Sequence, residues 1–394
     1  MIGKKYIYKI YSSSGTYITT WRDVSPPMPS FKINSGVSEL VIKLARKFYD
    51  FGEGNDVAIG NELKLFVSDK EAPAGVQIYS GELTKYHLIT GEKDEVEVTF
   101  LGYVFELARR IVVDGSGNTT LNYSTEDPSH VIKDVIDKVG SKVTYSTTSI
   151  EDTGLSVTYS VVQNTALEVL QRMVELAPAN WYWYLNVDNV LHFHNFDASS
   201  IRKFYIGKHI NKLEVTKTGE DVVNQYFFLG GGSPQLYKKY VRADSITQYG
   251  TKDIREQDER ITLAATALEK ATSYLDNYDH PQMCVSCTVI DSNIDHLNGV
   301  DIEQLRPGDA IQILHPGVKT TTTRWDVGIW DIDVWDFNIK TALGQTMRLE
   351  DIHYFGTGAT LKLGVLIPTV EKAIVKNTIL LENFRVKDSP VAPT

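Results

Sequence analysis

The sequence predicts a mainly β fold with α/β insertions, in which two similar small β-barrels are joined by a central α/β module. The first observation is a phrase that occurs twice, at residues 60–66 and 308–314. In each copy a Gly-Asn or Gly-Asp turn precedes a strand with apolar side chains at alternate positions. The second observation is a β-rich pattern around both copies. The third is a helical period in the stretch between them. Together they indicate an internal duplication.

Residues 1–110 are expected to form the first barrel. Strands are predicted over 6–11, 37–44, 62–66 and 77–81, followed by a hairpin of 83–89 and 95–102 that turns at Thr90-Gly91. The alternation of Val96, Val98 and Phe100 suits a half-buried antiparallel sheet. Strands at this spacing favour a small barrel or sandwich.

Residues 111–203 are predicted to form the α/β module, and a flexible turn at 114–118 marks the boundary with the first barrel. Asp127 is a suitable N-cap and Pro128 a suitable first-turn residue, so a helix is expected to start here. Its apolar positions form one stripe at the helical period, made by Val131, Ile132, Val135, Ile136 and Val139.

A second helix and a hairpin complete the module. Thr165 and Glu168 have the spacing of a capping box, and Pro178 ends the helix that they open. Residues 181–185 and 190–194 then predict two strands that turn between them.

The rest of the chain is expected to return to β structure. Residues 204–232 together with 283–360 predict the second barrel, interrupted by a helical insertion at 233–282, and 361–394 predict a C-terminal connector. The insertion carries a helix at about 262–278, whose inner side is predicted to hold Leu263, Ala267, Leu268, Ala271 and Leu275.

Composition and charge limit the classes of function. The chain has 394 residues, 42% hydrophobic and 23% charged, as expected for a globular protein with several domains. Its formal net charge is −10, and its basic clusters are short. Tight binding of nucleic acid normally requires a basic surplus or stripe, so the composition disfavours it. A transient contact with passing DNA remains compatible with the charge.

Two cysteines, Cys284 and Cys287, exclude a disulfide framework. No apolar run is long enough to span a membrane, and the N-terminus alternates polar and apolar residues, so the protein is expected to be made and folded in a cytoplasm. The cysteine spacing lacks the second ligand pair of a zinc site. Its flanks predict a strand with the two side chains on opposite faces, and buried structural cysteines are the preferred interpretation.

Other sequence patterns resemble functional sites without completing them. His192 and His194 share one face of a strand but have no third ligand nearby in the sequence. Residues 291–295 resemble the start of a calcium loop, yet His296 stands where glycine is required. Residues 229–233 lack the lysine of a phosphate loop and predict a strand end. We therefore predict no catalytic residues, no cofactor and no metal site.

Tryptophans recur every five residues at Trp325, Trp330 and Trp335. An aromatic platform for carbohydrate is one interpretation. Packing at a contact between domains or subunits is the preferred one, because tryptophan commonly anchors interfaces.

The order of the predicted elements resembles a known family, the tail hub or tail tip proteins of siphophage-type bacteriophages. Those proteins are similar in fold to the baseplate hub of contractile phages and the spike hub of type VI secretion. The resemblance covers most of residues 1–360 and rests on the stretches 79–81, 98–103, 107–110, 166–170, 183–185, 245–250, 262–277 and 305–313, together with the helix from Pro128.

The resemblance implies a homotrimer in which two barrels per chain make a ring of six. Such a ring would join the six-fold tail tube or distal tail protein to a three-fold central spike or fibre in the virion, and would leave a passage for DNA. It also implies a structural protein and not an enzyme. Two alternatives are a carbohydrate-binding tail protein that uses the tryptophans, and a cell-wall hydrolase whose carboxylates have no local signature.

Overall fold

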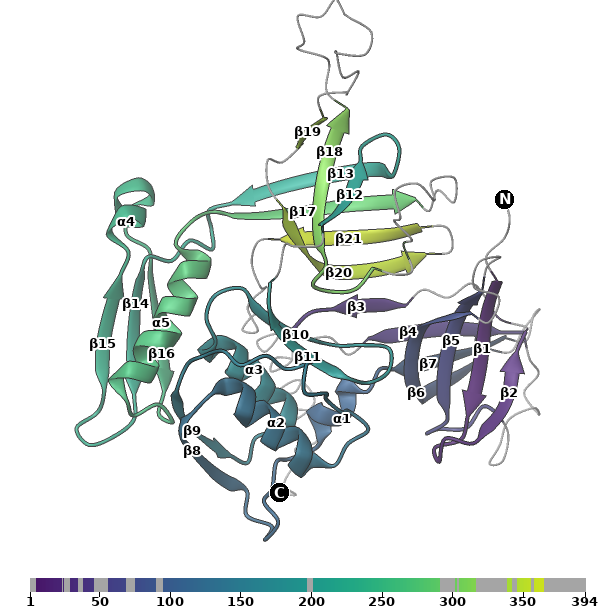
Figure 1. The fold of residues 1–394 in the computed structure, drawn as a ribbon, viewed down its shortest axis with the longest axis horizontal. Coiled ribbons are helices and arrows are strands. Elements are labelled where there is room, and N and C mark those ends of the chain that lie inside the picture. The colour runs from purple at the N-terminus through teal and green to yellow at the C-terminus, as the bar shows by residue number, and fades with distance from the viewer. Residues whose placement is uncertain are drawn as a thin grey trace, which may run out of the picture.

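The computed structural model describes residues 5–22, 24, 29–34, 38–45, 56–68, 75–89, 95–196, 201–290, 302, 305–316, 339–341, 346–355 and 358–364. Within these ranges the fold is mainly β with helical insertions, as predicted (Figure 1). No helix there is both long and apolar enough to cross a membrane.

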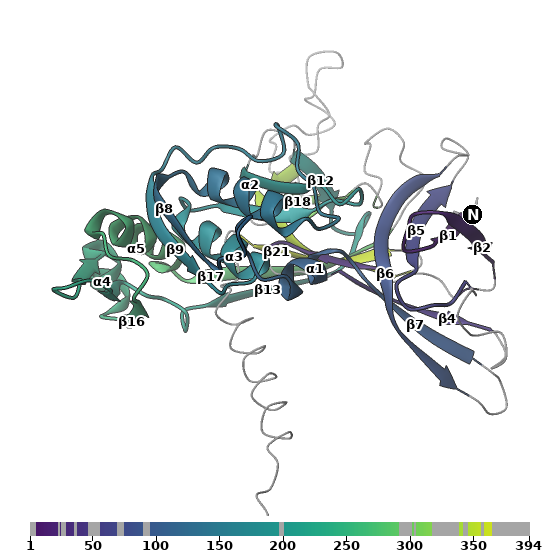
Figure 2. The same ribbon diagram turned by 90° about the horizontal axis from the view of Figure 1, so that it is seen from below.

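The N-terminal part forms a six-stranded antiparallel sheet with the order β2-β1-β5-β6-β7-β4. Its strong curl is visible along β6 in Figure 2, and a bridge between Val24 and Leu44 brings the two ends of the sheet together. Alternate side chains fill the inside of the curl. The strands are β1 (Lys5–Tyr11), β2 (Tyr17–Trp21), β4 (Glu39–Leu44), β5 (Glu62–Ser68), β6 (Val76–Ile89) and β7 (Glu95–Leu101).

Residues 76–89 form one continuous strand, where the sequence suggested two. A bulge between Leu83 and Lys85 keeps the pairing with β7 in register across the expected break. The turn predicted at Thr90-Gly91 lies outside the described residues.

The second sheet has the order β12-β18-β20-β21-β17-β13, with β19 added to β18 and β3 added to β20. It is built mainly from the C-terminal part of the chain and lies above the helical module in Figure 1. Its strands are β12 (Ile201–Tyr205), β13 (Ile210–Thr218), β17 (Gln282–Ile290), β18 (Ala310–Pro316), β19 (Ile339–Thr341), β20 (Met347–Phe355), β21 (Gly358–Gly364) and, from the N-terminal part, β3 (Ser30–Lys32).

The two sheets share the order of five strands. The order β1-β5-β6-β7-β4 of the first sheet corresponds to β12-β18-β20-β21-β17 of the second. The sixth strand differs, because β2 pairs with β1 whereas β13 pairs with β17. The repeated phrase therefore starts equivalent strands, β5 and β18. A short bridge between Ile206 and Ile210 links β12 to β13, where the first sheet has the hairpin of β1 and β2.

The turns that precede β5 and β18 also match in detail. Gly60 and Gly308 have φ angles of 91° and 94°, a region that glycine occupies without strain. The equivalent hydrogen bonds run from Gly60 N to Leu83 O (2.9 Å) and Gly308 N to Leu349 O (2.7 Å), and from Leu83 N to Asn61 O (2.7 Å) and Leu349 N to Asp309 O (2.9 Å). The phrase is thus repeated in structure as well as in sequence.

The direction of β12 is a second difference between the sheets. β12 runs parallel to β18, whereas β1 runs antiparallel to β5. Because β12 follows the helical module directly, its direction is set by where the module delivers the chain and not by a hairpin.

The helical module lies between the sheets and contains α1 (Val104–Arg109), β8 (Thr120–Glu126), α2 (Pro128–Val139), β9 (Val157–Val162), α3 (Ala166–Leu176), β10 (Trp181–Leu185) and β11 (Leu191–Asn195). Both predicted helix starts are confirmed. Asp127 accepts a hydrogen bond from Ser129 N, and Thr165 and Glu168 form a complete capping box. The apolar stripes of α2 and α3 face each other in the module's core.

The remaining segment forms a separate three-stranded sheet covered by a helix, at the left of Figure 1. Its elements are β14 (Gln225–Gly230), β15 (Tyr237–Val241), α4 (Ala243–Tyr249), β16 (Asp253–Asp258) and α5 (Ala264–Tyr278). β14 was grouped with the second barrel on sequence grounds, but it pairs with β15 and β16. Ala267, Ala271 and Leu275 of α5 are buried as predicted, whereas Leu263 and Leu268 are exposed.

The twin turns give a matched pair of mutations. A Cβ at Gly60 would meet no atom, whereas a Cβ at Gly308 would lie 2.3 Å from ring atoms of Tyr182. We expect Gly60→Ala to cost about 1–2 kcal/mol through its positive φ alone. Gly308→Ala should cost roughly 1–3 kcal/mol more, because the added methyl group overpacks the ring.

The measurement is the free energy of unfolding from urea titration of both variants. Equal losses for the two variants would show that Tyr182 does not press on the second turn. Gly308→Ala combined with Tyr182→Ala should remove the excess cost, since the ring is then absent.

Candidate functional site at the junction of the two sheets

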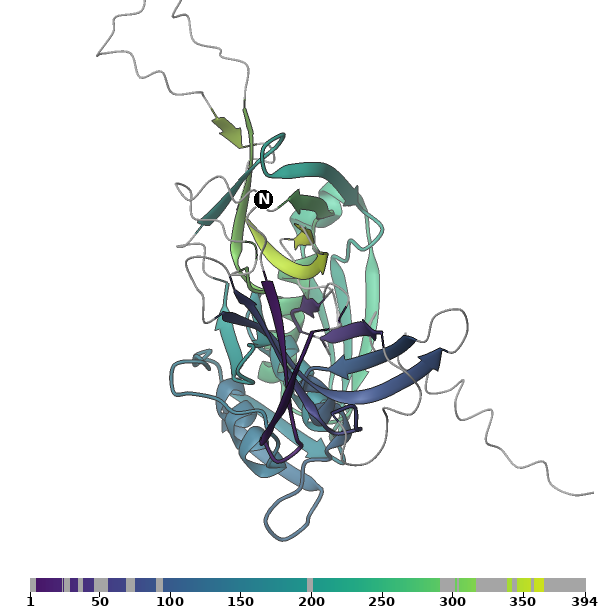
Figure 3. The ribbon, with the colours of Figure 1, turned by 90° about the vertical axis from the view of Figure 1, so that its right-hand side faces the viewer.

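The hairpin of β10 and β11 joins the module to both sheets. Its residues contact the first sheet at the tip, the second sheet along one face and β3 at one edge, as the following contacts show. In Figure 3, which looks onto the first sheet, the module lies beneath the second sheet. The junction therefore fixes how the two equivalent sheets lie relative to each other.

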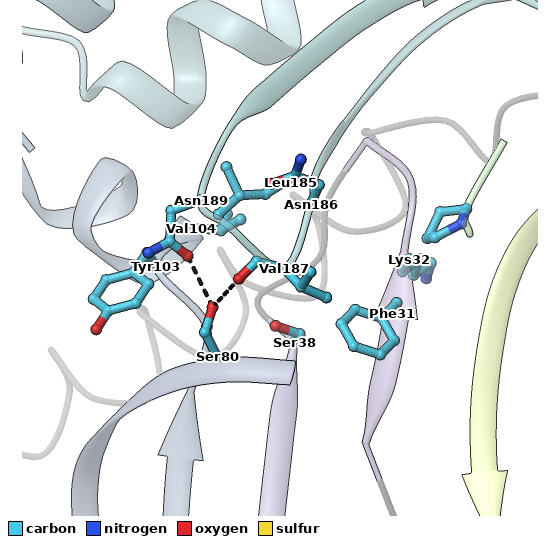
Figure 4. A pocket seen from close by; sticks show the side chains of 12 residues that line it. Phe31, Lys32, Ser38, Ser80, Tyr103, Val104, Leu185, Asn186, Val187 and Asn189 are labelled. Atoms are coloured by element: carbon cyan, nitrogen blue, oxygen red, sulfur yellow. Dashed lines mark hydrogen bonds between the residues drawn. The ribbon is translucent and has the colours of Figure 1, made fainter. Parts of the chain in front are cut away.

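At the tip of the hairpin, polar side chains of β6 bind its backbone. Ser80 Oγ donates to Val187 O at 2.7 Å and lies 3.0 Å from Asn189 Oδ1 (Figure 4). Gln77 Nε2 also donates to Val187 O at 2.7 Å. Ser80 is buried, so its hydroxyl depends on these partners. The contacts hold the tip against the outer face of the first sheet.

A small hollow opens beside this contact. It holds little more than a water molecule, so it does not have the dimensions of a substrate pocket. Its walls come from the first sheet, β3, the hairpin and the turn before β18, through residues that include Phe31, Ser38, Ser80, Tyr103, Asn189 and Pro307 (Figure 4). The hollow marks the point where the three parts meet.

A lysine of the module is held among carboxylates next to the first repeated turn. Lys142 Nζ pairs with Glu62, and Lys142 N donates to Glu106 Oε2 at 3.1 Å. Lys142 Nζ also lies 5.3 Å from the centroid of the Tyr103 ring. Glu62 and Glu82 are direct cross-strand partners. Burial raises the pKa of Glu82, an effect that Lys142 opposes.

β3 connects the module to the second sheet. Asn34 exchanges hydrogen bonds with Trp183: its backbone N donates to Trp183 O at 3.0 Å, and Trp183 N donates to Asn34 Oδ1 at 2.9 Å. The neighbouring Ile33 N donates to Glu350 O at 3.0 Å. Each of these buried backbone groups gains a partner that local structure could not supply.

Phe31 of β3 lies between the aromatic rings of the two sheets. Its ring centroid is 6.0 Å from that of Tyr79 on β6 and 6.2 Å from that of Tyr354 on β20. Both distances are those of favourable aromatic pairs. One side chain thus packs against equivalent strands of both sheets.

A buried charge pair on β20 lies against the face of the hairpin that is turned toward the second sheet. Arg348 Nη2 lies 3.5 Å from Glu350 Oε1, and Arg348 Nη1 donates to Asn180 O at 3.3 Å. The guanidinium carbon lies 5.3 Å from the centroid of Tyr182, the ring that rests on Gly308. Burial raises the pKa of Glu350 to about 7, although Arg348 opposes the shift.

The histidines of β11 belong to a hydrogen-bonded chain. Asn186 Oδ1 accepts from two backbone N–H groups, which directs Asn186 Nδ2 to His192 Nε2 at 3.2 Å. His192 Nδ1 lies 3.2 Å from His194 Nε2, and His194 Nδ1 lies 2.9 Å from Glu151 Oε1. The amide of Asn186 lies at one end of this series of hydrogen bonds and the carboxylate of Glu151 lies at the other. Both imidazoles are therefore placed to donate from Nδ1.

A second charged group fastens the three-stranded sheet to the module. Lys270 of α5 is buried and pairs with Glu256 of β16, while Arg172 of α3 pairs with Glu175 at 2.5 Å and lies 3.6 Å from Glu256. Asp258 and Arg260 form a further pair at 2.8 Å. The positive and negative charges are balanced, which is the arrangement expected of a structural network.

Of the sites considered from sequence, the two cysteines and the two histidines lie within the described residues. Cys284 and Cys287 lie on β17 and face opposite sides as predicted, but only Cys287 is buried, since Cys284 is exposed. His192 and His194 share a face, and Glu151 joins them. Even so, among the described residues no group of three His, Cys, Asp or Glu side chains is arranged to hold a metal ion.

Trp325, Trp330 and Trp335 and residues 291–296 lie outside the described residues. The junction residues were missed by sequence reasoning. Gly308 gave a signal through the repeated phrase, but Ser80, Asn34 and Tyr182 carry no local pattern that identifies them.

Lys142 provides a test of the junction. Replacement by Met should lower the free energy of unfolding by about 1–2 kcal/mol, because Glu62 and the nearby carboxylates lose their shared cation. Urea titrations at pH 7.5 and pH 5 provide the measurement. The loss should shrink at the lower pH, because burial raises the pKa of Glu82 and this carboxylate then takes up a proton. The exposed Lys217→Met serves as control, and an equal loss there would contradict the assignment.

His192 provides a test by pH. Burial, with a contribution from His194, lowers its pKa from 6.5 to about 4. The folded state therefore binds fewer protons than the unfolded chain between these values, so its stability should fall as the pH drops from about 6.5 toward 4. His192→Gln should remove roughly 1–2 kcal/mol of this pH dependence, with allowance for partial exposure. The exposed His87→Gln should leave the profile unchanged.

Comparison with known proteins gives a match in three dimensions. No family model and no curated protein matches the sequence. A prophage tail protein, gp18, from Listeria monocytogenes is 9% identical with a TM-score of 0.59, over 95% of this chain and 99% of its own. A 43 kDa tail protein of prophage MuSo2 from Shewanella oneidensis is 10% identical with a TM-score of 0.59, over 92% and 96%.

A tail protein from Neisseria meningitidis is 11% identical with a TM-score of 0.57, over 91% of this chain and 96% of its own. The likeness extends over almost the full length of each chain, and so includes both sheets and the module between them. The chain therefore has the fold of these prophage tail proteins, which confirms the resemblance inferred from the order of its elements.

Proposed function

We propose that this chain is a structural hub protein of a bacteriophage tail tip. In this role three copies form a ring that connects the six-fold tail tube to three-fold components of the tip. The proposal is supported by the likeness to prophage tail proteins over more than nine-tenths of the chain. The observation that carries it is the equivalence of the two sheets, in the order of five strands and in the hydrogen bonds of the repeated turns.

Two equivalent sheets per chain offer a direct solution to a symmetry mismatch. Three chains would present six similar units, and these could be spaced like the six subunits of a tube. We assign the first sheet to the first ring domain, and the second sheet, including β12 and β3, to the second ring domain. In this assignment the helical module and the three-stranded sheet that contains β14 lie outside the ring, and the residues after β21 are the proposed connector to neighbouring components.

The junction suits this role. A ring of alternating sheets requires a fixed angle between the two sheets of each chain, and the junction holds them with Phe31, Ser80 and Tyr182. A mobile junction would vary the spacing of adjacent units, so ring closure depends on its rigidity.

The proposed partners follow from the ring. The tail tube or a distal tail protein would lie on one side, a central spike or fibre on the other, and DNA would pass through the middle during ejection. A net charge of −10 supports passage without tight binding, since like charges repel phosphate. We propose a location in the virion tail and a role in assembly, without catalysis.

A reconstruction of the isolated tail tip tests the proposal. We expect three copies of the chain in one ring, with the first and second sheets alternating at six similar positions. The repeated turns at Gly60 and Gly308 should lie at equivalent heights along the tail axis. Six copies in a ring of six-fold symmetry, or copies absent from the tail tip, would contradict the proposal.

A further inference from the structure

A cavity lies between α3 and the loop that joins β16 to α5. Its volume is about 200 Å³, which is space for several water molecules or for one small ligand. The spacing of its helical residues places them on one face of α3. Every lining residue is polar: Asn164, Glu168, Gln171, Arg172 and Glu175 come from α3 and its N-terminal end, and Arg260 comes from the loop.

Gln171 places a free amide in the wall of this cavity. The residue is buried, with 8% of its surface exposed. Within the described part of the chain no group bonds to the amide, and the amide atoms keep access to the cavity. A primary amide offers two donors and one acceptor, so a recessed one gains from a ligand that supplies both kinds of partner.

Glu168 and Arg260 are held by protein partners, and each keeps one polar atom free. Glu168 Oε2 accepts from Asn164 Nδ2 and from the backbone N of the helix cap, both at 3.0 Å. Arg260 donates to Asp258 from Nε at 2.8 Å and from Nη2 at 3.2 Å. Among the described residues, Glu168 Oε1 and Arg260 Nη1 have no hydrogen-bond partner. The cavity therefore combines a fixed acceptor, a fixed donor and the amide of Gln171.

The charges that line the cavity are balanced. Arg172 and Arg260 provide two positive charges, and Glu168 and Glu175 provide two negative ones. An anion would meet two carboxylates and a cation would meet two guanidinium groups, so the lining favours neither. A hydroxyl group donates and accepts at once, so neighbouring hydroxyls on one molecule match an acceptor, a donor and an amide on one wall.

We propose that this cavity binds one uncharged sugar unit in its ring form. In this arrangement adjacent hydroxyls donate to Glu168 Oε1 and accept from Arg260 Nη1, and Gln171 bonds to the sugar between them. The site lies outside the proposed ring domains and uses no tryptophan. The inference therefore goes beyond the proposed function and does not depend on it.

Gln171→Leu is the sharpest variant. It keeps the approximate size of the side chain and removes only the amide, on which no described group depends, so the fold should be at least as stable. We expect the dissociation constant for the sugar to rise at least about fivefold, because the hydrogen bonds of the amide are lost. Gln235→Leu, at an exposed position away from the cavity, is the matched control.

Saturation-transfer NMR of the full chain with free glucose, galactose, mannose and N-acetylglucosamine provides the measurement. Titration should extend to about 20 mM, because a ligand of one ring makes few contacts. Thermal unfolding checks that each variant is folded. Binding of at least one sugar that weakens in Gln171→Leu and persists in Gln235→Leu supports the proposal. This binding should stay constant between about 50 and 300 mM salt, since the ligand is uncharged.

Two kinds of result would overturn the proposal. The first is absence of binding by all four sugars, or equal binding by the wild-type chain and Gln171→Leu. The second is binding of free glycine or inorganic phosphate in place of the sugars, with an affinity that falls as salt is added, which would assign the cavity to a charged ligand. Neither result bears on the three-fold ring, which the reconstruction of the tail tip tests separately.

Discussion

The packing of the β10–β11 hairpin against both sheets is the constraint on which the rest of the structure depends. Tyr182 fills the space left by the missing side chain of Gly308, and the hairpin tip accepts hydrogen bonds from Ser80 and Gln77. The repeated glycine thus has two uses. In both copies it allows the turn, and in the second copy it also admits the ring of a distant element.

From this contact the arrangement of the other parts follows. With the hairpin in place, Asn34 pairs with Trp183 and carries β3 onto the edge of β20. The backbone groups of β3 are then satisfied by a strand more than 300 positions away in the chain. Phe31 can then contact equivalent strands of the two sheets. Two similar sheets are thus held together by an asymmetric link.

The charged side chains fall into two kinds. Lys142 and the Arg172–Lys270 network hold parts of the chain to each other, and their charges are matched within the chain. Lys9 and Lys64 differ, because within the described part of the chain each ammonium group lies over an aromatic ring and neither pairs with a carboxylate. Two like charges directly opposite each other weaken the pair of strands that carries them.

Local patterns in the sequence determined a large share of the fold. Alternation predicted most strands of the first sheet, Asp127 and the Thr165 capping box predicted the starts of α2 and α3, and the repeated phrase identified β5 and β18 as equivalent. These features depend on neighbours within a few residues, so a single chain displays them. The tertiary structure alone decided the direction of β12, the pairing of β14, the position of β3 and the link between His194 and Glu151. Each joins residues that have no fixed spacing in the sequence, so local patterns could not identify the partners.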